Sequence, residues 1–104
     1  MNTLFIDTSS NQEITVGLIR DDKKNLITET IGKQKAQVVL PMIEKVLVKE
    51  KVSIKDINAV EVVAGPGSFT GLRVGVAIAN ALSYSLSIPI NKKPIGEFVV
   101  PIYE

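Results

Sequence analysis

The stretch from Gly65 to Gly75 has the sequence Gly-Pro-Gly-Ser-Phe-Thr-Gly-Leu-Arg-Val-Gly, and it joins two apolar segments. The segment before it, residues 59–64, is apolar enough for a central strand, and the pattern after it predicts a helix over residues 70–86. The four glycines of the stretch allow positive φ angles and a close approach of one backbone to another. We therefore expect a strand-to-helix junction in an α/β fold.

Two interpretations of this junction are open. A helix N-terminus presents free backbone amides and a partial positive charge, which suit a phosphate or carboxylate held near Gly67 and Ser68. Ser68 and Thr70 are also residue types that cap a helix. The stretch has neither the Gly-Lys-Ser/Thr of a P-loop nor the spacing of a dinucleotide fingerprint. From the residues alone we favour a tight turn that packs the helix closely on the sheet.

The remaining apolar patterns predict the order βββαβαβ. Strands are expected at residues 3–7, 13–20, 26–31 and 88–90, besides 59–64, and a first helix at residues 35–51. This order is typical of an α/β protein with a mixed sheet of about five strands and two main helices. We predict a single domain, with a lobe at residues 1–90 and a C-terminal tail at residues 91–104. Pro101 confines the tail to an edge strand or an irregular segment.

Composition excludes several kinds of chemistry. The 104 residues contain no cysteine and no histidine, so disulfides, thiolate nucleophiles, histidine bases and zinc sites built on these ligands are excluded. A net charge of +1 gives no support for a broad nucleic-acid surface. Residues 74–91 are uncharged, but polar residues interrupt them, whereas a membrane span needs about 20 predominantly apolar residues. We expect a cytoplasmic protein without a membrane segment.

A second polar cluster, Asp7-Thr8-Ser9-Ser10, follows the first predicted strand. A carboxylate at such a strand end can hold Mg²⁺ through water, and the neighbouring hydroxyls can contact phosphates. These residue types are also ordinary turn formers. We favour the structural role and keep Asp7 and Ser9, with Gly67 and Ser68, as the alternative cofactor-binding candidates.

The predicted helix at residues 70–86 has more apolar surface than one sheet can cover. Its polar stripe is narrow and consists of Arg73, Asn80, Tyr84 and Ser87. The apolar face is about twice as wide as a sheet contact requires, in a chain too small to bury it on all sides. We predict that the surplus face contacts another molecule; the alternative is that tail residues 98–103 cover it. Arg73 is expected either to be solvated or to bind an anion such as a partner's carboxylate.

Three motifs, in matching order and spacing, resemble the TsaB (YeaZ) family. They are Leu4-Phe-Ile-Asp-Thr-Ser9, Leu40-Pro-Met-Ile43 and the Gly65–Gly75 stretch, and the resemblance covers about residues 1–90. It implies a ribonuclease H-like lobe of the actin and sugar-kinase (ASKHA) type, and a role in making threonylcarbamoyladenosine (t6A) in tRNA. Family members are generally non-catalytic partners of the TsaD carbamoyltransferase. The TsaE ATPase joins them, and we expect contact with tRNA to be indirect.

The resemblance also implies an interface. Family members pair with TsaD, or with themselves as homodimers, through the two helices of this lobe. The interface residues carried over to this chain are Val39, Met42, Ile43, Val46, Leu72, Arg73, Val76, Ala79 and Leu82. No catalytic residue, metal site or cofactor is expected, and ATP, ADP or Mg²⁺ at a partner interface is a weak alternative.

The chain departs from the family pattern in its length. Family members usually have a second lobe about as long as the first, and this chain ends near the start of that lobe, with a tail that faintly resembles the family's closing segment. Because this superfamily binds nucleotides between two lobes, a single lobe is expected to bind them poorly. Two other hypotheses stay open: a nucleotide- or phosphate-binding lobe with enzymatic activity, and a self-associating structural protein.

Overall fold

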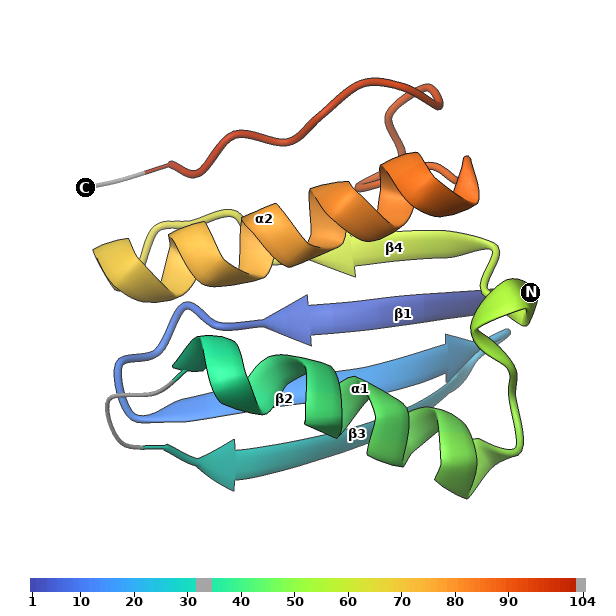
Figure 1. The fold of residues 1–104 in the computed structure, drawn as a ribbon, viewed down its shortest axis with the longest axis horizontal. Coiled ribbons are helices and arrows are strands. Elements are labelled where there is room, and N and C mark those ends of the chain that lie inside the picture. The colour runs from blue at the N-terminus through green and yellow to red at the C-terminus, as the bar shows by residue number, and fades with distance from the viewer. Residues whose placement is uncertain (32–34, 103–104) are drawn as a thin grey trace.

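The fold is a four-stranded mixed sheet with two helices on one face (Figure 1). The computed structural model describes residues 1–31 and 35–102. Three strands form an antiparallel meander: β1 (Asn2–Asp7), β2 (Glu13–Arg20) and β3 (Lys23–Thr30). Strand β4 (Ala59–Val62) pairs parallel to β1, which gives the sheet order β3-β2-β1-β4.

The two helices divide the sheet between them. Helix α1 (Lys35–Glu50) packs on β2 and β3, and α2 (Phe69–Leu86) packs on β4 and β1. A short 3₁₀ turn, η1 (Ile54–Asp56), separates α1 from β4. Both helices begin at the same end of the sheet (Figure 1). Neither they nor η1 have the length and apolar character needed to cross a membrane.

Alternating apolar residues on the central strands supply the sheet's part of the core. Side chains of a strand point to opposite faces in turn, so only every second residue meets the helices. Six of the buried residues in β1, β2 and β4 pair across the sheet in two rows. The members of these rows are Leu4, Leu18 and Val60 in one, and Ile6, Val16 and Val62 in the other. This pairing sets which face of the sheet α1 and α2 cover.

The predicted fifth strand at residues 88–90 is wrong. Among the described residues, only an isolated bridge between Val60 and Ile90 continues the sheet beyond β4. Asn91 turns the chain with a φ of 49°. Its side-chain Oδ1 accepts a hydrogen bond from the Val62 N–H at 2.8 Å, and its Nδ2 donates to the Val62 carbonyl at 3.0 Å. A side-chain amide therefore takes the place of further strand pairing.

The tail runs beside α2, on the side away from α1 (Figure 1). Asn80 of α2 exchanges two hydrogen bonds of 2.9 Å with the backbone N–H and carbonyl of Val99. Val99 is only 7% exposed and joins the core, while the ring of Phe98 packs against Tyr84. Of the two expected forms of the tail, residues 91–102 have the irregular one, with no strand among them. Residues 103 and 104 lie outside the described residues.

Candidate functional site

The two polar clusters from the sequence meet where β1 ends and α2 begins. The Ser68 backbone N–H donates to the Ser9 carbonyl at 2.8 Å. A Cβ on Gly67 would lie 2.7 Å from that same oxygen, so only glycine lets the loop lie against the end of β1. The structure thus brings the four cofactor-binding candidates, Asp7, Ser9, Gly67 and Ser68, to one place.

The polar groups at this junction bind one another. One carboxylate oxygen of Asp7 accepts hydrogen bonds from the Ser9 N–H at 2.9 Å and from the Ser9 hydroxyl at 2.6 Å. Ser68 caps α2, with its Oγ accepting from the Gly71 N–H at 3.4 Å. The described residues contain no group of three or more acidic side chains placed to hold a metal ion. The geometry favours the interpretation of a packing turn over that of a phosphate cradle.

Thr8 fixes the position of α2 on the sheet. Its buried hydroxyl donates to the Gly71 carbonyl in the first turn of the helix. One turn later, a Cβ on Gly75 would lie 2.2 Å from the Thr8 Oγ1. The helix therefore lies on β1 with Gly75 and the Gly71 carbonyl on its sheet-facing side, and this orientation determines which α2 residues remain open.

This orientation places most of the predicted interface residues in the core. Seven of the nine are at most 4% exposed: Val39, Met42, Ile43, Val46, Leu72, Val76 and Ala79. We correct their assignment, because a residue buried by its own lobe offers no surface to a partner. Leu82 is half-buried at the edge of the core, and Arg73 is exposed.

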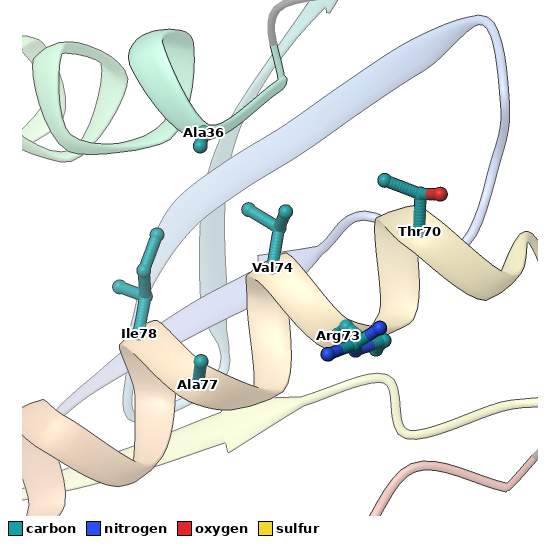
Figure 2. A pocket seen from close by; sticks show the side chains of 6 residues that line it. All are labelled: Ala36, Thr70, Arg73, Val74, Ala77 and Ile78. Atoms are coloured by element: carbon teal, nitrogen blue, oxygen red, sulfur yellow. The ribbon is translucent and has the colours of Figure 1, made fainter.

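The open apolar surface lies on the neighbouring side of α2. Val74 and Ile78 are half-buried and point toward Ala36 at the start of α1 (Figure 2). Together with Thr70, Arg73 and Ala77 they line a hollow of about 460 Å³ between the two helices. The tail lies on the opposite side of α2 (Figure 1). Part of the wide apolar face of α2 is therefore open beside α1, at Val74, Ala77 and Ile78, and the described part of the tail covers the other side of the helix.

Among the described residues that line this hollow, Arg73 is the one with a charged side chain. Its guanidinium carbon lies 5.4 Å from the centre of the Phe69 ring, which is a cation–π distance. In the described parts of the chain, no carboxylate forms an ion pair with Arg73. The hollow is thus an apolar surface with a positioned and unpaired positive charge.

The interface carried over from the family resemblance does not include five of the lining residues: Ala36, Thr70, Val74, Ala77 and Ile78. The glycines alone do not mark these residues. At 100° per residue, Ile78 lies about 40° from the mean direction of Gly71 and Gly75, whereas the buried Ala79 lies about 60° from it. The place of Ala36 depends on how α1 packs beside α2, which one sequence does not show.

The architecture defines a class of protein. An antiparallel β1–β2–β3 meander, a parallel β4, and helices α1 and α2 on one face form a ribonuclease H-like lobe of the ASKHA type. This confirms the predicted fold class, with four strands in place of about five.

Comparison with known sequences narrows the class to a family. Residues 24–92 match the family model of TsaD, described as tRNA N6-adenosine threonylcarbamoyltransferase, and the chain belongs to this family. The expected resemblance to TsaB (YeaZ) is confirmed by relatives that carry those names. The chain is 41% identical over 87 residues to the tRNA threonylcarbamoyladenosine biosynthesis protein TsaB of Buchnera aphidicola from Schizaphis graminum, covering 84% of this chain and 41% of the relative.

Two further comparisons agree. The TsaB protein of Escherichia coli K12 is 37% identical over 90 residues, which are 86% of this chain and 38% of the relative. The solved structure of YeaZ from Pseudomonas aeruginosa superimposes with a TM-score of 0.80 at 29% identity, over 86% of this chain and 41% of that one. The chain therefore spans about two fifths of the length of the relatives it matches.

Proposed function

We propose that this chain takes part in t6A modification of tRNA as a non-catalytic partner of a TsaD-type threonylcarbamoyltransferase. The observation that carries the proposal is the open apolar hollow between α1 and α2, on a chain whose relatives are named for t6A biosynthesis. A helix of the TsaD-type protein docks in the hollow. This contact holds the TsaD-type protein in an active arrangement. A TsaE-type ATPase joins the complex, and homodimers form through the same surface when the partner is absent.

The lining of the hollow suits a helical partner. Ala36 and Ala77 have short side chains that let another backbone come close, and the half-buried Val74 and Ile78 have apolar surface still to cover. Full burial of one aliphatic side chain contributes about 1.5–3 kcal/mol relative to exposure. Only the part that exceeds the loss of translational and rotational freedom appears as affinity.

Replacing Ala77 with glutamine tests the proposal. The side chain at position 77 is exposed in the free chain, so the fold should tolerate the change. In the docked complex the long amide would fill the hollow and lose its water. We expect at least about 10-fold weaker binding to the TsaD-type protein from the same genome, measured by titration calorimetry.

Ala81→Gln is the matched control, because Ala81 is exposed on the same helix and does not line the hollow. It should bind like the unchanged chain. Equal affinity of the Ala77→Gln and Ala81→Gln variants, or no complex with the unchanged chain, would rule out docking in the hollow.

A further inference from the structure

We propose that Arg73 orients the docked partner by pairing with a carboxylate on the partner's helix. The occupant of the hollow is then a helix of the TsaD-type protein with an Asp or Glu about one turn from its apolar contact residues. This inference rests on the proposed function, because it concerns the same hollow. It adds a chemical requirement on the partner and a residue that determines specificity.

The requirement follows from desolvation. Arg73 is exposed in the free chain, where water solvates its charge. A helix that covers Val74, Ala77 and Ile78 removes much of that water, since Arg73 lines the same hollow. A desolvated guanidinium without a counter-ion strongly opposes docking.

The described part of the chain places no counter-ion at Arg73, so in this proposal the partner supplies it. None of the six lining residues is acidic, and no carboxylate of the described chain forms an ion pair with Arg73. A partner carboxylate at this point would gain a charge-assisted, bidentate contact, which the planar guanidinium favours.

Arg73 is also positioned in advance for such a contact. It lies in the first half of α2, a helix fixed by the Thr8 hydrogen bond to Gly71, and its guanidinium stacks over Phe69 at 5.4 Å. A side chain held in place loses less freedom on binding. The apolar contacts in the hollow are non-directional, so the ion pair sets the register of the docked helix.

The charges favour this partner over a second copy of the chain. Helix α1 does present a carboxylate, Glu44, between the exposed apolar residues Leu40 and Val48. The same outer face also carries Lys45 and Lys49. Seating this face in the hollow would bring two cations toward Arg73, which like-charge repulsion disfavours.

The test measures binding of the full chain to the TsaD-type protein by titration calorimetry at low and high salt. Arg73→Gln should weaken binding at least about 30-fold, because the partner's carboxylate would then be buried unpaired. Arg73→Lys should weaken it about 10-fold, since a point charge replaces a bidentate one. The salt dependence should flatten in Arg73→Gln. Lys55→Gln, which removes an exposed positive charge on η1, should bind like the unchanged chain.

A double-mutant cycle then identifies the carboxylate. Each acidic residue on the partner's docking helix is changed to its amide and combined with Arg73→Gln, and one of them should show no further loss in the double variant. Urea unfolding of Arg73→Gln should match that of the unchanged chain, because the side chain is exposed.

Three outcomes would overturn the inference. If Arg73→Gln binds normally while Ala77→Gln does not, the hollow docks the partner without an ion pair, and the proposed function survives alone. If neither variant affects binding, both proposals fail. If partner binding is unchanged but Arg73→Gln and Glu44→Gln each dissociate a homodimer in sedimentation experiments, the carboxylate belongs to a second copy.

Discussion

Gly75 shows how one missing side chain determines the exposed surface of this lobe. A Cβ at this position would overlap the Thr8 Oγ1, so the glycine lets α2 lie directly on the end of β1. Once that side faces the sheet, Val76 and Ala79 are buried, and Val74 and Ile78 are left toward α1. The orientation of α2 about its own axis therefore determines which of its residues lie in the core and which remain open for docking.

Gly75→Ala should destabilise the lobe, although alanine is the better helix former by about 1 kcal/mol. Overpacking against Thr8 opposes that gain, and the cost of such overpacking is typically about 1–3 kcal/mol. Urea unfolding should show a net loss of up to about 2 kcal/mol. Ser85→Ala, at an exposed position of the same helix, should be neutral or slightly stabilising. A gain in stability from Gly75→Ala would contradict the close approach.

Ala79→Gln should behave differently from Ala77→Gln. Ala79 is fully buried, so a long amide there must displace core side chains and lose its hydrogen bonds with water. We expect a loss of about 3 kcal/mol or more in the free energy of unfolding, against less than about 0.5 kcal/mol for Ala77→Gln. Circular dichroism during urea unfolding measures both, and equal losses would contradict the orientation of α2.

Local residue types predicted the junction well, whereas most of the interface residues carried over from the family resemblance lie in the core. Ser68 as a cap and the glycine turn follow from the chemistry of those residues alone. Val39, Met42 and Val76 recur at helical steps, but this spacing is the same for a core stripe and for a docking stripe. Only the packing of the helices on the sheet distinguishes the two, and one sequence does not contain it directly.

Helix α2 has three different surroundings. One side of it packs on the sheet, a second side contacts the tail through Asn80 and Tyr84, and a third side lines the hollow with Val74 and Ile78. The unusual width of its apolar face was visible in the sequence. The sequence offered the tail beside this helix as an alternative, but not the side that it covers, since Val99 is a single buried residue in a segment without periodicity.

The end of the sheet shows a second limit of sequence patterns. Residues 88–90 are extended and apolar, which predicts a strand, but the amide of Asn91 takes over the pairing with Val62. A left-handed residue at this position stops the strand, and a single asparagine gives only a weak signal of that.

Asn91→Gly tests the role of this side chain, because glycine keeps the positive φ while removing the amide. Two hydrogen bonds to Val62 would be lost at a half-buried edge. We expect a loss of about 1–3 kcal/mol in the free energy of unfolding, and faster hydrogen exchange at the Val62 amide. Unchanged exchange at Val62 would show that water replaces the amide without loss.

In the molecule as a whole, the two helices leave an apolar hollow open between them. The polar groups where β1 ends and α2 begins, in contrast, bind one another. The Asp7 carboxylate binds Ser9, and the Ser68 amide binds the Ser9 carbonyl, so groups suited to a nucleotide phosphate are already in use. The whole-molecule prediction is therefore a docking protein rather than a nucleotide-binding enzyme.

We expect Mg²⁺–ATP to bind the isolated chain with a Kd of about 1 mM or weaker in titration calorimetry. The reason is that phosphate contacts would have to break the Ser9–Asp7 and Ser9–Ser68 hydrogen bonds. Micromolar binding that disappears in Asp7→Asn would instead support the enzymatic hypothesis.

The most direct test of docking is site-specific photo-crosslinking to the TsaD-type protein. A photoreactive benzoylphenylalanine replaces Thr70 at the rim of the hollow or, as a matched control, Thr28 of β3, an exposed residue paired with Thr15 on the face away from the helices. We expect a crosslinked complex from position 70 and none from position 28. A crosslink from position 28 without one from position 70 would place the partner on the other face of the sheet and rule out docking between the helices.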